Sequence, residues 1–196
     1  MKINLNNKYS NQFVKVYDDV LNNQFCKKLI KSFPNDKWHE HTFYNEKTKK
    51  AEQYSGKDEL AVLYYHDFNS DLKDDLMKRL WKVIQRYTIE LDMPWYNQWS
   101  GYSPIRFNKY KKNKKMALHC DHITSLFTGE ARGIPTLSLL GALNENYEGG
   151  EFIMFEDKTI SLKSGQILIF PSNFMFPHKV EPVTKGTRYT FISWVY

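Results

Sequence analysis

The chain from Trp95 onwards is divided into short apolar segments, and this division constrains its fold more than any other feature. Turn-forming residues such as Lys163-Ser164-Gly165 and Lys185-Gly186 recur about every eight to twelve residues. The segments between them have the length of strands and are short for helices. We predict strands at residues 105–110, 116–119, 136–143, 150–155, 159–162, 166–171, 178–180 and 187–195. Many short strands with regular turns are typical of a sandwich or jelly roll, and this set predicts a double-stranded β-helix, a cupin-like fold.

The N-terminal half contains two segments with helical periodicity. A helix is predicted from Asn22 or Asn23, either of which can cap it, to about Phe33. A longer amphipathic helix is predicted at residues 71–92, where apolar residues recur at three- and four-residue spacing until Pro94. The longer helix should lie against the outside of a sheet. The expected fold class is therefore mostly β with flanking helices (α+β).

Length and composition agree with one domain. The chain has 196 residues, of which 41% are hydrophobic, enough for a single sizeable core. Aromatic residues make up 16% and favour strands, and short strands are also predicted at residues 13–17 and 60–65. We expect residues 1–99 to form a supporting region of strand and helix, and residues 100–196 to form the β-helix core of the same domain.

The charge and cysteine content indicate compartment and partners only broadly. A net charge of +6 gives a weak preference for acidic partners and no evidence of nucleic-acid binding. The basic runs at residues 47–50 and 111–115 are typical of solvated loops. Cys26 and Cys120 do not suggest a disulfide framework, and no stretch reads as a signal peptide or a membrane span. We therefore expect a soluble, cytoplasmic protein with reduced thiols.

The tripeptide His119-Cys120-Asp121 carries two potential metal ligands. Side chains at i and i+2 of an extended segment point to the same face, so His119 and Asp121 can bind one ion while Cys120 points away. His178 can supply a third ligand from another strand. Two imidazoles and one carboxylate leave three coordination positions open, the arrangement of non-haem Fe(II) oxygenases. The alternative is a buried, hydrogen-bonded polar cluster.

The sequence around these residues makes the signal specific. Tyr110 stands nine residues before His119, and further characteristic stretches are Leu-Asn-Glu-Asn-Tyr-Glu-Gly-Gly-Glu-Phe at 143–152, Ser-Gly-Gln-Ile-Leu-Ile-Phe-Pro at 164–171, His-Lys-Val-Glu-Pro-Val at 178–183 and Gly-Thr-Arg at 186–188. In order and spacing, residues 105–194 resemble the catalytic domain of the 2-oxoglutarate and Fe(II)-dependent oxygenases, in particular the prolyl 4-hydroxylase-like branch.

The resemblance implies roles for individual residues. His119, Asp121 and His178 would bind Fe(II). Arg188 would bind the distal carboxylate of 2-oxoglutarate, since a guanidinium can hold a carboxylate through two hydrogen bonds. Tyr110 would donate to the same carboxylate. The alternatives are a surface ion pair for Arg188 and a packed core aromatic for Tyr110. O2 would be the second co-substrate, and ascorbate an optional reductant.

The implied reaction converts 2-oxoglutarate to succinate and CO2 while hydroxylating an unactivated C–H bond. The first hypothesis for the substrate is a peptidyl residue, with proline foremost. The second is a free amino acid or other small metabolite. A third hypothesis, from another class, is a non-catalytic β-helix binding module, which predicts that a metal ligand or the carboxylate anchor is missing. The expected partner is thus a peptide, a protein or a small molecule.

The sequence departs from the family pattern near Tyr110. Asn113 stands where a Gly often follows that tyrosine by three residues, and it lies among the lysines of residues 111–115. We expect this loop to pass near the mouth of the site, where four ammonium groups would attract an acidic substrate. Arg188 also stands where collagen-modifying members tend to carry Lys, which disfavours that subgroup.

Three of the four histidines outside the proposed ligand set stand close to another potential ligand. His122 follows Asp121 directly, and strand alternation points it away from His119, so we expect it beside the site or at the surface. His39 and His41 form an alternating pair without a third ligand after them. Both are predicted to be exposed loop histidines.

Overall fold

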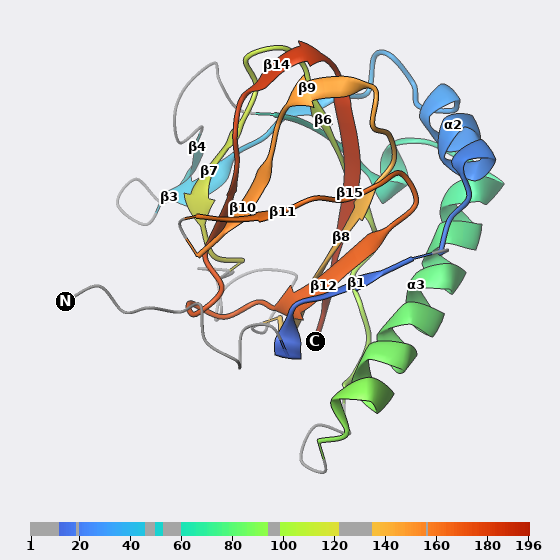
Figure 1. Cartoon of the computed structure of the whole chain (residues 1–196). Coiled ribbons are helices and arrows are strands. Elements are labelled where there is room, and N and C mark those ends of the chain that lie inside the picture. The colour runs from blue at the N-terminus through green and yellow to red at the C-terminus, as the bar shows by residue number, and fades with distance from the viewer. Residues whose placement is uncertain are drawn as a thin grey trace.

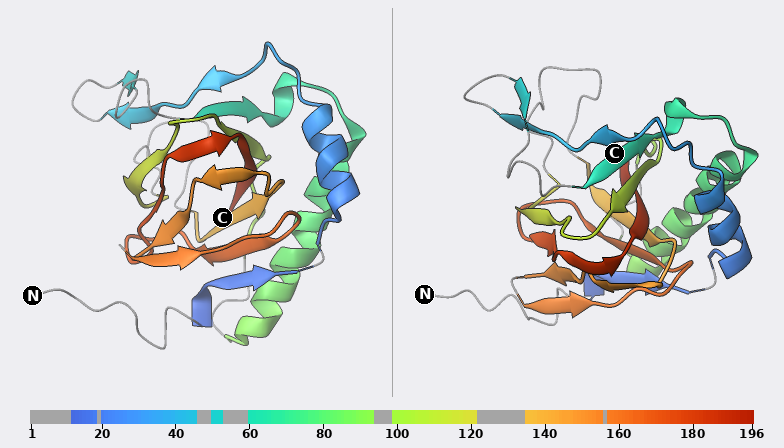
Figure 2. Two further views of the ribbon diagram at one scale, coloured as in Figure 1. Left: turned by 45° about the horizontal axis from the view of Figure 1, so that its top comes forward. Right: turned by 90° about the horizontal axis from the view of Figure 1, so that it is seen from above.

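In the part of the chain that the structure describes, two packed β-sheets curve round a common interior, and two α-helices cover the larger sheet (Figures 1 and 2). The structure is a computed structural model, and it describes residues 12–18, 20–45, 50–52, 60–93, 99–121, 135–155 and 157–196. The predicted fold class, mostly β with flanking helices, is confirmed.

The larger sheet has seven strands in the order β1 (Lys15–Tyr17), β12 (Ile167–Pro171), β8 (Leu137–Ala142), β15 (Arg188–Val195), β6 (Arg106–Tyr110), β5 (Ala61–Tyr64) and β2 (His39–Glu40). The smaller sheet has four strands in the order β11 (Lys158–Ile160), β10 (Phe152–Met154), β13 (His178–Val180) and β7 (Met116–His119). Two pairs complete the described strands: β14 (Val183–Gly186) with β9 (Tyr147–Gly149), and β3 (Phe43–Asn45) with β4 (Lys50–Glu52).

All eight strands predicted between residues 105 and 195 are present, with ends that differ by no more than two residues. Strands β9 and β14 are not predicted from sequence. Residues 147–150 have the composition of a turn, and they form strand β9 followed by a bend at Gly149 and Gly150, whose φ angles are 72° and 67°. The bend agrees with the two glycines of this stretch. Strand β9 depends instead on its pairing with β14.

Strand β15 divides its side chains between two cores. Phe191 and Val195 are buried in the cluster between the larger sheet and the helices. Ile192 instead packs against the cluster between the two sheets. Because alternate residues of a strand share a face, Arg188 and Thr190 lie on this inner face as well. A single strand therefore supports the helices on one side and faces the interior with polar residues on the other.

The two α-helices are α2 (Asn23–Lys31) and α3 (Asp71–Leu91). Helix α2 is capped by Asn22, whose Oδ1 accepts a 2.8 Å hydrogen bond from the backbone N–H of Phe25. Ser70 caps α3, which ends at Asp92 in the left-handed conformation. The predicted stop at Pro94 lies outside the described residues. None of the described helices is long and apolar enough to cross a membrane.

Helix α3 lies against the outer face of the larger sheet, as predicted. Its apolar stripe is buried under that sheet, with Leu76, Leu80, Ile84 and Tyr87 fully enclosed. Burying each such aliphatic side chain contributes about 1.5–3 kcal/mol. This contact is the main support of the sheet from outside.

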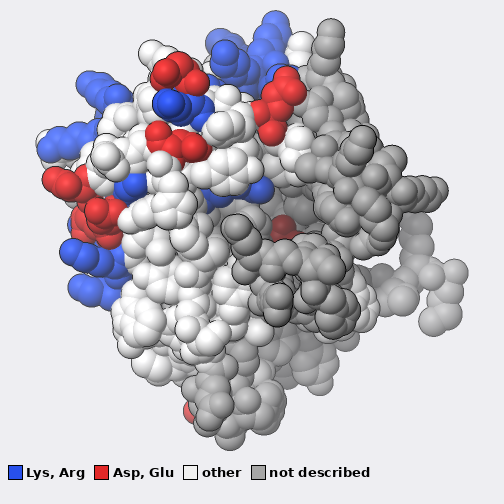
Figure 3. Space-filling model, turned by 180° about the vertical axis from the view of Figure 1, so that it is seen from behind, with Lys and Arg blue, Asp and Glu red and all other residues white. Residues whose placement is uncertain are grey.

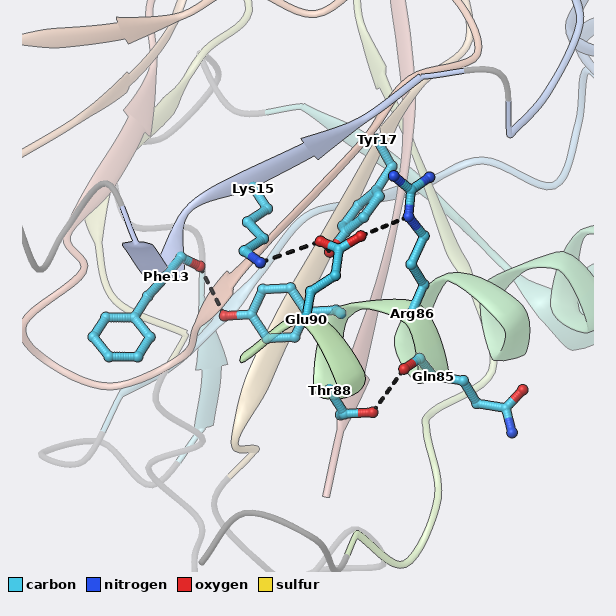
Figure 4. A network of polar contacts seen from close by, with 8 residues as sticks. Phe13, Lys15, Tyr17, Gln85, Arg86, Thr88 and Glu90 are labelled. Atoms are coloured by element: carbon cyan, nitrogen blue, oxygen red, sulfur yellow. Dashed lines mark hydrogen bonds and ion pairs between the residues drawn. The ribbon is translucent and has the colours of Figure 1, made fainter. Parts of the chain in front are cut away.

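Polar contacts fix strand β1 to the end of α3 (Figure 4). One carboxylate oxygen of Glu90 accepts hydrogen bonds from Lys15 Nζ at 3.1 Å and from the Tyr17 hydroxyl at 3.0 Å. The other oxygen accepts from Arg86 Nε at 2.7 Å. Water and salt screen these exposed pairs, so they add little to stability. Their effect is to orient β1 where it joins the sheet.

Strands from the first half of the chain extend the larger sheet at both edges. Val16 of β1 pairs with Leu168 of β12 at one edge. Leu63 of β5 pairs with Phe107 of β6 near the other edge, and β2 follows beyond it. The N-terminal region and the β-helix core therefore share one sheet.

Gly141 allows β8 to pack closely against β15. It lies directly opposite Phe191, and a Cβ at this position would stand 1.9 Å from Cζ of the phenylalanine ring. We expect Gly141→Ala to lower the free energy of unfolding by about 1–3 kcal/mol, the usual cost of overpacking, as measured by urea denaturation. Combining it with Phe191→Leu should relieve the overlap, so that the double variant loses less stability than the two single losses added. Additive losses would contradict the predicted clash.

Candidate metal centre and its cavity

His119, Asp121 and His178 converge at one end of the smaller sheet. Strand β7 ends at His119 and β13 begins at His178, and their antiparallel pairing places the two histidines opposite each other. Asp121 follows two residues after His119. The ligand atoms of the three side chains lie within 4.8 Å of one another. The fold thus brings together residues that are far apart in the sequence.

Backbone carbonyl groups orient both imidazoles. Nδ1 of His119 lies 2.8 Å from the carbonyl oxygen of Ala117, and Nδ1 of His178 lies 3.1 Å from that of Phe176. Because a carbonyl oxygen only accepts, each Nδ1 carries the hydrogen and each Nε2 presents a lone pair. These Nε2 atoms lie 3.4 Å and 3.7 Å from Oδ1 of Asp121. Such hydrogen bonds behind the ring are typical of metal-binding histidines.

Ser138 holds the Asp121 carboxylate and is itself in contact with Ser172. Ser138 Oγ donates to Oδ2 at 2.6 Å and lies 2.7 Å from Ser172 Oγ. Burial raises the pKa of Asp121, but the two histidines and the Ser138 hydrogen bond outweigh burial and hold this pKa well below its usual range. The carboxylate is therefore ionised at neutral pH, with Oδ1 directed towards the imidazoles.

His178 lies among aromatic rings. It is 5% exposed, and its ring centroid lies 5.2 Å from that of Phe152 and 5.1 Å from that of Phe170. Burial lowers the pKa of His178 to about 4, against the opposing effect of Asp121. The imidazole is therefore neutral at neutral pH, which is the form that binds a metal ion.

This donor set fits Fe(II). Two imidazole nitrogens and one carboxylate oxygen that face a shared point form the arrangement of non-haem Fe(II) oxygenases. A structural zinc site would need a fourth ligand. Within the residues that the structure describes, no further His, Cys, Asp or Glu joins this group.

Arg188 is buried and does not form a surface ion pair. It is 2% exposed, and the register of β15 with β6 places it opposite Tyr110. The guanidinium carbon lies 5.0 Å from the centroid of the Tyr110 ring. Neither Nε nor Nη1 of Arg188 has a hydrogen-bond partner within the described structure. A buried guanidinium with unsatisfied donors requires an anionic partner. Tyr110 is itself buried in the core between the sheets.

A second pair of polar residues lies next to Arg188 on the inner face. Asn108 and Thr190 are opposite each other in β6 and β15. Oδ1 of Asn108 and Oγ1 of Thr190 are also buried without hydrogen-bond partners among the described residues. Asn108 and Tyr110 line the cavity that contains the three candidate metal ligands. An anionic molecule between Arg188 and the metal could accept hydrogen bonds from Arg188 and from the Thr190 hydroxyl, whereas Oδ1 of Asn108 needs a donor.

Arg106 lines the same cavity, although the sequence assigns it no role. Its guanidinium carbon lies 5.4 Å from the centroid of the Trp194 ring, and its Nε is buried without a hydrogen-bond partner in the described structure. Because β6 alternates, Arg106 shares the inner face with Asn108 and Tyr110. The same alternation was visible in the sequence: Arg106 stands four residues before Tyr110 and so belongs to the same strand face.

His41 is buried at 4% exposure, so the prediction of an exposed loop histidine is wrong. Burial, together with the charges of Arg106 and His119, lowers the pKa of His41 to about 3. Its backbone N–H donates to the carbonyl oxygen of Leu60, which extends the sheet beyond β2. His39, in contrast, is exposed as predicted. The sequence did not reveal this difference because it gave no sign that β2 pairs with β5.

The lysine-rich loop at residues 111–115 joins β6 to β7, at the end of β7 opposite His119. The backbone N–H of Asn113 donates to the carbonyl oxygen of Val183 at 2.7 Å, so the loop packs against the start of β14. Strand β7 then runs from Met116 to His119, roughly 10 Å further. Tyr110 before the loop and Met116 after it both line the cavity of the candidate metal ligands, so a loop near the site mouth stays a prediction. Asn113 has a φ of 65°, a conformation that Asn tolerates nearly as readily as the usual Gly.

The two cysteines are free, as predicted, with Cys26 buried and Cys120 partly exposed. His122 lies outside the described residues.

Charged side chains of both signs mingle on the face shown in Figure 3. Lys and Arg lie among Asp and Glu, and much of the described surface on this face is uncharged. Among the described residues on this face, Lys and Arg therefore form no continuous basic groove of the kind that nucleic-acid binding requires.

Comparison with known proteins agrees with this geometry. Residues 105–196 match the family model described as the 2OG-Fe(II) oxygenase superfamily. A PKHD-type hydroxylase of Delftia acidovorans is 30% identical over 99 residues, which cover 47% of this chain and 43% of the relative. One from Janthinobacterium sp. is 33% identical over 107 residues, which cover 48% and 43%. The matches thus span less than half the length of these curated relatives.

Solved structures share the fold over nearly the whole chain. A prolyl hydroxylase from Trichoplax adhaerens, in complex with a peptide fragment of hypoxia inducible factor, has a TM-score of 0.70 at 16% identity and covers 98% of this chain and 86% of its own. The viral collagen prolyl hydroxylase of Paramecium bursaria Chlorella virus-1 has a TM-score of 0.65 at 14% identity, with 93% and 94% covered. At this identity the likeness establishes the double-stranded β-helix fold alone.

The geometry predicts graded effects on metal binding. His178→Ala removes one donor of three. We therefore expect the affinity for Fe(II) or Mn(II) to fall further than in a variant of a residue that only supports a ligand. Ser138→Ala removes only the hydrogen bond to Asp121 and should weaken binding by about tenfold to a hundredfold. Anaerobic titration calorimetry measures both, with His39→Ala as the exposed control. Equal affinity in the His178→Ala and His39→Ala proteins would exclude His178 as a ligand.

Proposed function

We propose that the 2OG-Fe(II) oxygenase domain at residues 105–196 makes this protein a dioxygenase that hydroxylates an unactivated C–H bond. Bound Fe(II) would supply the oxidising chemistry, with O2 and 2-oxoglutarate consumed and succinate and CO2 released. One observation carries the proposal. Two oriented imidazoles and the Asp121 carboxylate converge in the same interior that holds the unsatisfied guanidinium of Arg188.

His119, Asp121 and His178 are the proposed Fe(II) ligands. Their donor atoms occupy one side of the ion and leave positions open to the co-substrates. The carbonyl oxygens behind the imidazoles and the Ser138 hydroxyl hold the donors in place, so little ordering is needed when the ion binds.

Arg188 is the proposed partner of the distal carboxylate of 2-oxoglutarate. Its unsatisfied N–H groups can donate to a carboxylate in a site shielded from water, where such hydrogen bonds are strong. We propose that the Tyr110 hydroxyl donates to the same carboxylate, while the face of its ring packs against the guanidinium of Arg188. Asn108 and Thr190 would form the polar wall beside the co-substrate.

The surroundings of the ligands serve the same reaction. Phe152 and Phe170 enclose His178, which keeps bulk water from this side of the centre. The strands from residues 1–99 complete the sheet that carries Arg188, which supports a single domain built from both halves. A binding module without activity would lack a metal ligand or the carboxylate anchor, and all of these residues are present.

A peptidyl residue, with proline foremost, is the first candidate substrate. The support is the similarity to proteins named PKHD-type hydroxylases and, in fold, to prolyl hydroxylases, one of them in complex with a peptide. A free amino acid or another small acid is the second candidate. The presence of Arg106 beside the metal ligands favours it.

A turnover assay tests the function directly. Protein supplied with Fe(II), 2-oxoglutarate, O2 and ascorbate as reductant should release succinate, and His119→Ala should not. Substrate panels of peptides and of free amino acids should raise succinate release and yield a product heavier by one oxygen atom. Succinate release by the His119→Ala protein equal to that of the native protein would contradict the proposal.

Arg188→Lys tests the co-substrate role. Lysine keeps the positive charge but loses the planar set of donors, so we expect the affinity for 2-oxoglutarate to fall by about tenfold or more. Metal affinity should change little, because Arg188 lies outside the ligand group. Calorimetric titration of 2-oxoglutarate into the Mn(II)-loaded protein gives the measurement, with the exposed Arg86→Lys as control. Unchanged 2-oxoglutarate affinity in Arg188→Lys and also in Arg188→Ala would place the anchor elsewhere.

A further inference from the structure

We propose that Arg106 binds a carboxylate of the molecule that the enzyme oxidises. This inference rests on the proposed function and adds the chemical class of the substrate, an acid whose carboxylate lies close to the oxidised carbon. It concerns a residue that the proposed metal and co-substrate sites leave unused.

Arg106 and Arg188 stand at two ends of one inner face. Arg106 begins β6, whereas Arg188 lies opposite Tyr110 at the other end of that strand. The four residue steps from Arg106 to Tyr110 correspond to roughly 13 Å. Arg106 lines the cavity together with His119, Asp121 and His178. The metal ligands therefore share their cavity with a guanidinium separate from the proposed co-substrate anchor.

The guanidinium of Arg106 is held in place but not satisfied. Its carbon lies 5.4 Å from the centroid of the Trp194 ring, a cation–π contact that restricts the side chain. Nε is buried and has no hydrogen-bond partner among the described residues. An arginine stays charged at neutral pH, so a half-buried guanidinium with an unsatisfied N–H favours an anion as its partner. A planar group fixed against an aromatic ring is prepared to receive a carboxylate.

Among the described residues, the charges in the cavity leave Arg106 without an anion once the centre is loaded. Asp121 is the carboxylate that acts on Arg106 through space, and in the proposed enzyme it binds Fe(II). The two carboxylates of 2-oxoglutarate have cationic partners in the metal ion and Arg188. Adding the formal charges of Fe(II), Asp121, 2-oxoglutarate, Arg188 and Arg106 leaves one positive charge. A substrate carboxylate would neutralise it.

The same carboxylate chemistry can come from two sources. One is the free α-carboxylate of an amino acid or related small acid, and the other is an acidic side chain of a peptide. Free L-proline and the blocked dipeptide acetyl-Asp-Pro-amide represent these sources, and the neutral acetyl-Pro-amide represents neither. Whichever acid raises succinate release above that seen with acetyl-Pro-amide identifies the source.

The binding test uses a minimal matched pair of probes. N-acetylglycine and N-acetylglycinamide differ only in carboxylate against amide, and both are titrated by calorimetry into protein loaded with Mn(II) and 2-oxoglutarate. We expect the acid to bind at least about tenfold more tightly than the amide, because a charge-assisted hydrogen bond has about that effect or more. Arg106→Met should abolish this preference while the aliphatic chain still packs on Trp194. Arg86→Met, an exposed arginine of α3, should leave it unchanged.

Arg106→Lys provides a second variant in case Arg106→Met does not fold. It keeps the charge and should keep part of the preference for the acid. The inference is overturned if the acid and the amide bind the native protein equally, or if the preference survives in Arg106→Met. It is also overturned if Arg106→Met weakens 2-oxoglutarate binding, because the guanidinium would then serve the co-substrate. Failure of the native protein to bind Mn(II) and 2-oxoglutarate at all would instead contradict the proposed function.

Discussion

The pairing of β15 with β8 and β6 is the constraint on which the rest of the structure depends. One face of β15 places Phe191 and Val195 under the helices, where they anchor the outer core. The opposite face turns Arg188 and Thr190 towards the smaller sheet. Packing of the outer core therefore fixes the register of the inner face, since a slip of one residue would exchange the two faces. The position of a buried cation is set by apolar contacts on the other side of its own strand.

The smaller sheet supplies the complementary half of the interior. The pairing of β7 with β13 places His119 opposite His178, and carbonyl oxygens two residues before each histidine direct both Nε2 atoms towards Asp121. Burial would favour a neutral carboxyl group, yet the two imidazoles and Ser138 keep Asp121 ionised. The result is an anionic centre that suits a divalent cation, flanked by guanidinium groups that suit anions. Metal and anionic molecules would thus stabilise each other's binding.

Much of the β-helix was predictable because its signals are local. Strand length, turn composition and alternation located the eight strands from residue 105 onwards to within two residues. Strands β9 and β14 were not predictable in this way, because each is held chiefly by the other and by the bend at Gly149. The strand β2 was missed for the same reason: two residues carry no periodicity, and only pairing with β5 makes them a strand. The buried position of His41 followed from that pairing and was missed with it.

The sequence by itself determined the chemistry of the candidate site. The spacing of His119 and Asp121 predicted that they share one face, and the family resemblance added His178 and Arg188 as candidates. Only the tertiary structure decided which other charged groups lie with them. It brought Arg106 into the cavity of the metal ligands and carried the lysines of residues 111–115 to the opposite end of β7. Spacing along one strand is a property of the chain, whereas proximity between strands depends on register and packing, which arise from the whole fold.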